Sequence, residues 1–297
     1  MNIITNHFSI KDIENLSGIK AHTIRIWEKR YQLFEPKRTD TNIRYYVVED
    51  LKKILNVSLL VSKGLKISKI SKLSDDEIRE AVILQVANSN SSEGFENAVL
   101  MAMLNFDQNQ FELIYNKLTA EFSFREIFNN LFIPLLYKIG LQWQSDTITP
   151  AHEHFISNLI TQKLHVNIER VNQTDNVVND KVFVLFLPLQ EIHQLGLLFI
   201  QYELILKGYK TIFLGERVPL ESLESVFKLH KNISFISYFT VFPPKEKVIE
   251  YLKSFEQKYL KNGNKLLVGG RNVEGIELEG ILNVEVFKDF KALLKYV

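Results

Sequence analysis

Three patterns of hydrophobic and polar residues follow one another along the chain. Over residues 1–73 the apolar positions recur every three or four residues in short runs, which is the spacing of one face of a helix. The same spacing continues in longer runs from about residue 94 to residue 171. From Lys181 onward, short continuous apolar runs such as KVFVLF alternate with helical patterns. The chain is therefore expected to combine helical parts with an α/β part.

The first region predicts a helix-turn-helix. Ser9 is a suitable N-cap for a first helix, and the Ser17–Gly18 pair breaks it. A second helix is expected from about Ala21 to Tyr31, with Trp27 on its apolar face as a core residue. The segment FEPKRTDTNIRYY is rich in turn formers and predicts a small β-wing, followed by a helix from about Val48 to Lys63.

The other two regions predict a bundle and a sheet. Four amphipathic helices joined by short turns, as in a four-helix bundle, are expected near residues 94–105, 107–122, 124–143 and 149–171. The runs KVFVLFLPL, KTIFLG, NISFISYF and KLLVGG, each followed by a helix or turn pattern, predict a doubly wound parallel sheet of Rossmann or flavodoxin-like type.

These elements define four segments. They are a DNA-binding head over residues 1–75, a linker over 76–93, a helical bundle over 94–174 and an α/β domain over 175–297. The run NSNSSEG is the loosest part of the linker by composition. The chain length of 297 residues suits two or three domains.

Composition and charge narrow the functional classes. The absence of cysteine excludes disulfides and thiolate metal sites, and no apolar run reaches the roughly 18 residues of a membrane helix. No secretory signal is apparent at the start, so a cytoplasmic protein with no membrane partner is expected. The net charge of +1 conceals a basic head, with 14 Lys and Arg against 7 Asp and Glu in residues 1–73. A basic head on an acidic body indicates a polyanionic partner.

The basic head carries the side chains expected to contact DNA. The second helix presents donors suited to base edges and phosphates, and the wing adds cations for phosphates and a tyrosine that packs or donates a hydrogen bond. These candidates are His22, Thr23, Arg25, Lys29, Arg30, Lys37, Arg38, Arg44 and Tyr45.

The run HTIRIWEKRYQLFEPKRTDTNIRYYVVEDLKKI resembles the winged helix-turn-helix of the MerR family of bacterial transcription regulators, and the match extends over residues 8–73. Asn42 stands where the wing of that family often has glycine, and asparagine tolerates positive φ. The resemblance implies a homodimer or homotetramer on double-stranded, near-palindromic operator DNA. RNA polymerase at the promoter is a further candidate partner.

A second group of residues marks the open edge of the predicted sheet. Glu191-x-His193-x-x-Gly196 follows the first strand, Ser237 ends a later strand, and Gly269–Gly270 ends the next. Ligands of doubly wound sheets bind beyond the carboxyl ends of the strands. A single histidine there is more often structural than a ligand. The combination nevertheless resembles the cobalamin-binding domain of corrinoid enzymes and regulators, over about residues 181–297.

The resemblance implies a role for each residue. A corrin leaves two axial positions on cobalt, so the His193 imidazole would be the lower ligand and Glu191 would accept from its other ring nitrogen. Gly196, Gly269 and Gly270 would let the nucleotide tail pass close to the backbone. Tyr238 and Phe239 are bulkier than the residues usual in the family and would narrow that channel.

The bundle adds a candidate cap. Trp143, followed ten residues on by Glu153 and His154, resembles the cap of the light-sensing, MerR-type cobalamin regulators. In these relatives a tryptophan covers the upper ligand and the Glu-His pair lies close by. A core tryptophan and a surface Glu-His pair are the structural alternative. Gln144 replaces the histidine that follows the tryptophan in those relatives, and His152 or His154 are the candidates to substitute for it.

The sequence therefore predicts a transcription regulator and repressor that is not an enzyme. Its oligomerisation and operator binding would respond to a corrinoid, expected to be adenosylcobalamin, with light sensing as an added possibility. Two alternatives remain open. One is a regulator of the same fold that binds no cobalamin and answers to a protein partner or another ligand. The other is a corrinoid enzyme or methyl carrier.

Overall fold

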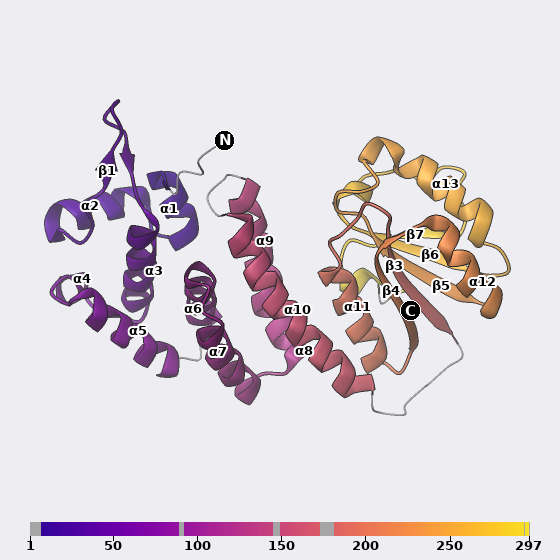
Figure 1. Ribbon diagram of the computed structural model, residues 1–297, viewed down its shortest axis with the longest axis horizontal. Helices are drawn as coiled ribbons and strands as arrows, with labels where there is room; N and C mark the ends of the chain where they lie inside the picture. The colour runs from indigo at the N-terminus through magenta and orange to yellow at the C-terminus, as the bar shows by residue number, and fades with distance from the viewer. Residues whose placement is uncertain (1–6, 89–91, 145–148, 173–180, 294, 297) are drawn as a thin grey trace. The chain divides into compact units, whose positions relative to one another are not determined.

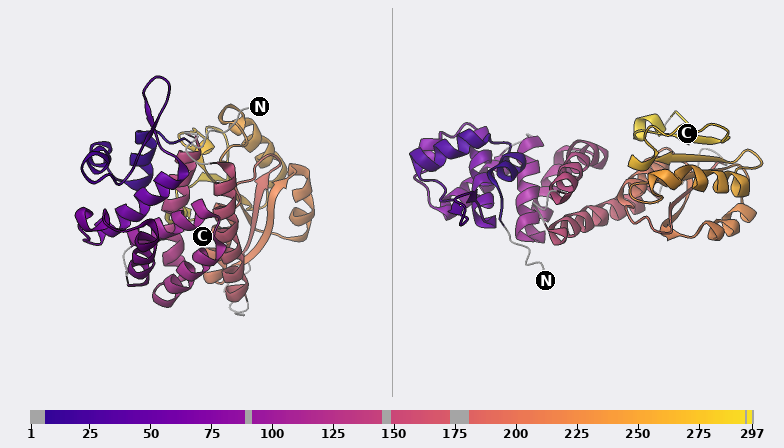
Figure 2. Two further views of the ribbon diagram at one scale, coloured as in Figure 1. Left: turned by 60° about the vertical axis from the view of Figure 1, so that its left-hand side comes forward. Right: turned by 90° about the horizontal axis from the view of Figure 1, so that it is seen from above.

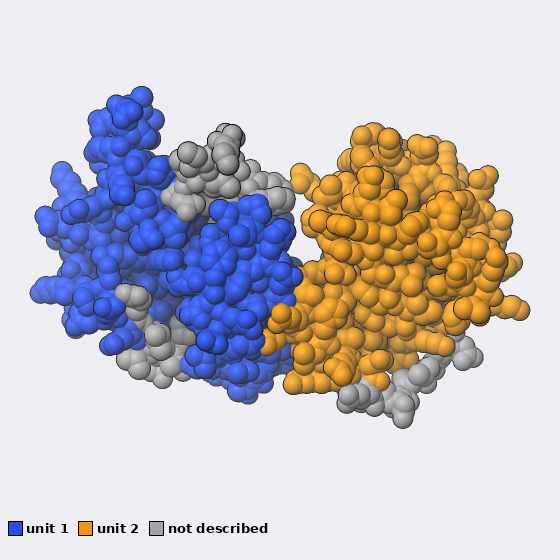
Figure 3. Space-filling model, viewed as in Figure 1, with its two compact units in different colours: residues 1–160 blue, residues 161–297 orange. Residues whose placement is uncertain are grey.

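The computed structural model describes residues 7–88, 92–144, 149–172, 181–293 and 295–296 (Figure 1). The chain divides into two compact units, residues 1–160 and 161–297, drawn in blue and orange in Figure 3. None of the helices in the described ranges is long and apolar enough to cross a membrane.

The head forms as the sequence predicted. Helix α1 (Ile10–Ser17) is capped by Ser9, whose hydroxyl accepts from the Asp12 amide, and ends at Gly18 with φ of 71°. Helix α2 (Ala21–Tyr31) buries Ile24 and Trp27. Strands β1 (Lys37–Arg38) and β2 (Arg44–Tyr45) pair antiparallel and make the wing. The wing projects from the head as a narrow hairpin (Figure 2, left).

Helix α3 (Val48–Ser62) is the centre of unit 1. It packs against α1, α5 (Asp75–Asn88) and α6 (Ser92–Asn105), while α4 (Ile67–Ile70) follows it directly. Its buried residues cover nearly its whole circumference and form an unbroken run from Ile54 to Leu60, with Leu51 before it. The expected linker, residues 76–93, is helical through Asn88, and Ile78 and Val82 of α5 are buried. The head thus continues into the bundle through packed helices.

The bundle follows the predicted periodicity. After α6 come α7 (Gln108–Glu121), α8 (Phe124–Ile127), a π-helical turn (Phe128–Phe132), α9 (Ile133–Gln144) and α10 (Pro150–Asn172). The π turn packs Phe128 and Phe132 edge to face at 6.1 Å between ring centroids. Apolar periodicity alone predicted one continuous α-helix through this segment and did not reveal the π-helical turn, where the helix is locally wider.

Unit 2 contains the predicted parallel sheet, with one strand more than expected. The strands are β3 (Val182–Pro188), β4 (Lys210–Val218), β5 (Ile233–Tyr238), β6 (Lys265–Gly269) and β7 (Val284–Val286), in the order β4-β3-β5-β6-β7. All neighbouring pairs are parallel. The three residues of β7 are too few to show a pattern in the sequence.

Helices cover both faces of the sheet. One face packs on α12 (Glu224–Leu229) and α13 (Val248–Tyr259), which Figure 1 shows beside the strands. The other packs on α11 (Leu195–Leu206) and the short α14 (Phe290–Leu293). Strand β4 lies on one side of β3 and β5 on the other, so the order of the strands reverses between β3 and β5. The crevice where ligands of such sheets bind lies at the carboxyl ends of these two strands.

Candidate functional site

The candidate DNA-binding side chains lie on the solvent side of α2 and the wing. His22, Arg25, Lys29 and Arg30 of α2 are exposed, and Thr23 is half-buried. Ile24 and Trp27 anchor the opposite side of the helix, and Trp27 lies 6.4 Å from Phe34 between ring centroids. Trp27 is thus a core residue, as the sequence indicated. The arrangement gives α2 a polar outer surface held at a fixed angle by an apolar inner one.

The wing is shaped by its own side chains. Asn42 adopts the left-handed conformation, with φ of 65°, as expected for a residue in place of glycine. Arg38 Nη1 donates to Asn42 Oδ1 at 2.7 Å, so this guanidinium braces the turn, while Lys37 is exposed. The Tyr45 ring lies 4.1 Å from that of His7, which favours the packing role for Tyr45.

Glu28 ties the wing to α2, a role the sequence did not reveal. The Tyr46 hydroxyl donates to Glu28 Oε1, and Arg44 Nε lies 3.5 Å from Glu28 Oε2. Burial, and then the adjacent Glu28 carboxylate, raise the pKa of Tyr46. Arg44 Nε is buried without a hydrogen bond, so this part of the guanidinium faces Glu28 rather than solvent. The Arg44 side chain is 39% exposed, so its contact with a phosphate stays a prediction.

The candidate cap residues are described in part. His154 Nδ1 lies 2.9 Å from Glu153 Oε2, and the His154 side chain is exposed. Trp143 and Gln144 fall in the last turn of α9, but their side chains lie outside the described residues. The Glu-His pair is therefore an accessible, preformed pair on α10.

His152 faces a different direction from His154. It is buried, its ring stacks on Phe106 at 4.6 Å, and Nδ1 is hydrogen-bonded to Thr149 Oγ1 at 2.8 Å. Two residues apart on a helix are about 200° apart around its axis, so His152 and His154 point to opposite sides. His152 lines an open pocket of about 570 Å³ shared with Val47 and Lys52 of the head. Burial, and then the charge of Lys52, lower its pKa.

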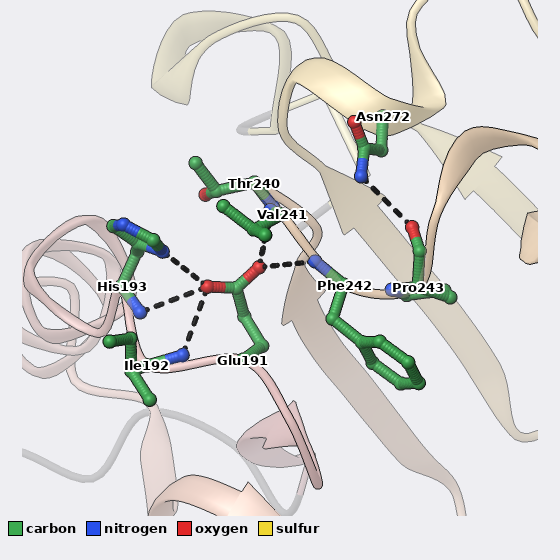
Figure 4. Close-up of polar contacts among 8 residues, drawn as sticks. All are labelled: Glu191, Ile192, His193, Thr240, Val241, Phe242, Pro243 and Asn272. Carbon is green, nitrogen blue, oxygen red and sulfur yellow. Dashed lines mark hydrogen bonds and ion pairs between the residues drawn. The ribbon is translucent and has the colours of Figure 1, made fainter. Parts of the chain in front are cut away.

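The sheet-edge site is built around one fully buried carboxylate, Glu191 (Figure 4). Its Oε1 accepts from the amides of Ile192 and His193 at 2.9 and 3.0 Å, and pairs with His193 Nδ1 at 2.5 Å. Its Oε2 accepts from three successive amides of the loop after β5, those of Thr240, Val241 and Phe242, at 2.9, 2.7 and 3.0 Å. Glu191 therefore fastens together the two loops that flank the crevice.

The environment of Glu191 keeps it ionised. Burial alone would raise its pKa, but hydrogen bonds from the His193 imidazole and from the amides of Phe242, Val241 and His193 outweigh burial and lower the pKa to about 2. A carboxylate held in this way fixes the tautomer and orientation of the imidazole paired with it. Asn272 supports the same loop from its far side, since its side-chain amide donates to the Pro243 carbonyl at 2.9 Å (Figure 4).

The remaining predicted residues surround the same edge. Ser237 is buried and its hydroxyl donates to the Phe186 carbonyl at 2.9 Å, so it ties β5 to β3. Gly196 is exposed at the start of α11, and nothing lies within 4 Å of where its Cβ would be. Gly269 and Gly270 are both buried, and neighbouring residues of the chain lie against them.

The residues fit one part of a corrinoid and not another. His193 is exposed, with Nδ1 paired to Glu191, so Nε2 is the nitrogen through which it would bind cobalt. Since a corrin supplies four nitrogens itself, a single imidazole is sufficient, and no group of three metal-ligating side chains occurs among the described residues. The glycine pair, by contrast, is covered by other residues of the chain, because Phe287 lies against Gly269 and the Phe239 backbone lies against Gly270.

Two known families match successive parts of the chain. Residues 8–77 match the MerR HTH family regulatory protein, and residues 96–166 match the B12 binding domain. The head of the chain is thus similar to MerR-type regulators, and the residues similar to the B12 binding domain lie in helices α6 to α10 of the bundle.

Curated relatives extend over most of the chain. The HTH-type transcriptional repressor CarH of Myxococcus xanthus is 27% identical over 223 residues, 73% of this chain and 73% of the relative. The HTH-type transcriptional repressor CarA of the same organism is 23% identical over 241 residues, 80% of this chain and 78% of the relative. Among solved structures, the monomethylamine corrinoid protein of Methanosarcina barkeri superposes with a TM-score of 0.59 at 13% identity. It covers 70% of this chain and 100% of its own length, and the likeness concerns the fold.

Proposed function

We propose that this protein is a transcriptional repressor whose oligomerisation and operator binding respond to a bound corrinoid, with adenosylcobalamin as the form. The observation that carries the proposal is the Glu191–His193 pair at the crevice of a sheet domain, in one chain with an exposed basic helix and wing. The MerR and B12-binding matches and the two repressors similar to most of the chain support it.

Each part of the chain has a task in this proposal. A bound corrinoid would supply a cobalt centre. His193 would hold it through Nε2, and Glu191 would keep the proton on Nδ1 and the ring in one orientation. Trp143 excludes water from the upper side, while Glu153 accepts hydrogen bonds from ribose hydroxyls. Light sensing belongs to the proposal as well. Light-sensing relatives have a histidine at the position of Gln144, and His154 takes over its role here, because His154 is exposed whereas His152 is buried.

The coupling to DNA runs through subunit pairing. An ordered cap exposes a surface that pairs subunits, and two heads then occupy the two halves of a near-palindromic operator. A ligand can shift such an equilibrium only by its difference in affinity for the two states. Cofactor binding and oligomer size must therefore change together.

The first test is an absorbance spectrum of the protein mixed with adenosylcobalamin in the dark and desalted, then repeated after green light. A retained corrin spectrum is expected for the wild type and for His230→Ala, a control in the same unit, and its loss for His193→Ala. Size-exclusion chromatography and operator binding on the same samples should show a larger oligomer and tighter binding with the cofactor.

Other outcomes separate the alternatives. If the protein binds its operator but retains no corrin spectrum, and His193→Ala does not change operator binding, the proposed control by a corrinoid is wrong. This outcome would support a regulator controlled by a protein partner or another ligand. Methyl transfer to a thiol in the presence of the corrinoid would instead indicate an enzyme or methyl carrier. A spectrum that is retained but unaffected by light would remove light sensing alone.

A further inference from the structure

Contacts within the chain itself account for the two glycines at the end of β6. A methyl group on Gly269 would lie 2.4 Å from Cε2 and 2.6 Å from Cζ of Phe287. Gly270 has φ of 105°, and a methyl group there would lie 2.4 Å from the Phe239 carbonyl oxygen. The small size of both residues therefore brings other parts of the protein close, where an open channel for a ligand was expected.

The ring against Gly269 belongs to an aromatic pair. Phe287 is 2% exposed, and its centroid lies 6.2 Å from that of Tyr238. Tyr238 stands directly opposite Gly269 in the register of β5 and β6. Both aromatic side chains pack in the apolar layer between the sheet and α11, together with Leu197 and Ile200. The carboxyl end of the sheet is thus filled by aromatic rings on the face that α11 covers.

This is the face along which a nucleotide tail would run. His193 and Gly196 lie at the start of α11, and Gly269 lies two strands away from β3 at the same edge of the sheet. A tail passing from a corrin on His193, beside Gly196, toward Gly269 enters the layer under α11 and meets Phe287. Phe239 does not obstruct this face, because its side chain lies in the layer on the other side of the sheet.

We propose that Phe287 closes the nucleotide subsite, so that the protein takes a corrinoid without a nucleotide tail directly and admits cobalamin only when the Phe287 ring moves aside. This inference rests on the proposed corrinoid function and specifies its ligand. Exposing a buried phenyl ring corresponds to about ten- to hundred-fold in a binding constant. The ring should therefore weaken binding of the tailed ligand by about that factor.

The experiment compares cobinamide, which lacks the nucleotide, with cobalamin, both in the aquo form, by absorbance titration of the full chain. Phe287→Leu should tighten or accelerate cobalamin binding about ten-fold and change cobinamide binding less than about two-fold. Phe183→Leu is the matched control, because Phe183 is fully buried in the same apolar layer on β3. Its ratio of cobalamin to cobinamide affinity should equal that of the wild type.

Each outcome decides the matter. An equal effect of Phe287→Leu on both ligands, or none on either, would overturn the gate and leave the corrinoid function standing. If wild type and variants bind neither ligand, the proposed function fails and the gate with it. Should Phe287→Leu unfold by circular dichroism, Phe287→Met carries the same expectation, because its flexible side chain can fill an irregular gap.

Discussion

The DNA-binding face of the head and the crevice of the sheet are organised in opposite ways. In the head, the candidate side chains are mostly exposed and come from one helix and one hairpin. At the crevice, one fully buried carboxylate joins two loops about fifty residues apart through five amides and an imidazole. The free-energy effects of separate substitutions in the head should therefore be additive, whereas a single substitution at the crevice should disrupt the whole site.

The largest effect is expected for Glu191→Ala. Five amides and the His193 imidazole lose their acceptor, and breaking a buried charged network of this kind costs about 3–5 kcal/mol. Thermal unfolding should show the transition of unit 2 displaced downward, with operator binding in the absence of cofactor unchanged. Glu285→Ala, in the same unit but only half-buried on β7, serves as the control. An unfolding midpoint equal to that of the control would mean that the crevice is not one cooperative site.

The next effect concerns two cations of the head. Arg25→Ala should weaken operator binding by about 1–3 kcal/mol if the guanidinium reads a base edge. Lys37→Ala should instead reduce the slope of log affinity against log salt by about one, as for a lost phosphate contact. Lys231→Ala, on an exposed loop of unit 2, is the control.

The double variant sharpens the comparison. If the head consists of separable contacts, the losses for Arg25→Ala and Lys37→Ala should sum to within about 0.5 kcal/mol in fluorescence-anisotropy titrations. A marked departure from the sum would give the head the cooperative character assigned to the crevice.

A smaller effect is expected for Glu28→Ala, because Glu28, like Glu191, is a carboxylate that joins two segments of the chain. Tyr46 and Arg44 lose their shared partner, which should cost about 1–2 kcal/mol of unit 1 stability in urea titrations and loosen the wing. The exposed Glu35→Ala should leave stability unchanged. Equal stability of the two variants would argue against a tie between the wing and α2.

The smallest effect is a difference in acid sensitivity between the units. The pKa of His152 is lowered from 6.5, so its contribution to stability is present above pH 6.5 and is lost as pH falls through the lowered pKa. The pKa of Glu191 is lowered from 4.5 to about 2, so its contribution, about 3 kcal/mol, persists above pH 4.5 and is lost toward pH 2.

Between pH 6.5 and 4.5 these groups therefore destabilise only unit 1. Hydrogen exchange resolved by peptide should show protection falling first near His152, and His152→Gln should remove that early loss. Simultaneous loss in both units, unaffected by the substitution, would contradict the assignment.

Much of the fold could be predicted from the sequence because its signals are local. The caps and breaks of α1, the wing turn at Asn42 and the four bundle periods all depend on neighbouring residues. The parallel sheet followed from alternating apolar and helical runs. Strand β7 and the π-helical turn escaped prediction because three residues and one widened turn carry too little pattern.

The sequence could predict those parts of the sites that consist of side chains, but not those that consist of backbone groups. Exposed cations on α2 and the Glu191–His193 pair could be recognised from residue type and spacing. The three amides of Thr240–Phe242 could not, because every residue but proline has an amide and only the fold aims it. Phe287 was missed for a related reason, since its contact with Gly269 joins two strands in space and leaves no periodic signal.

Helix α3 is buried around nearly its whole circumference. This limits where a DNA-binding head can be separated from its sensor domain and joined to another one. A DNA-reading module that ended after the wing would leave this helix with an apolar side uncovered, and an exposed patch of this size favours aggregation. Any sensor grafted onto this head, by evolution or by design, would have to bring helices shaped to α3 as α5 and α6 are. The smallest exchangeable piece therefore includes part of the bundle, and a chimera joined at residue 75 should be less soluble than one joined at residue 106.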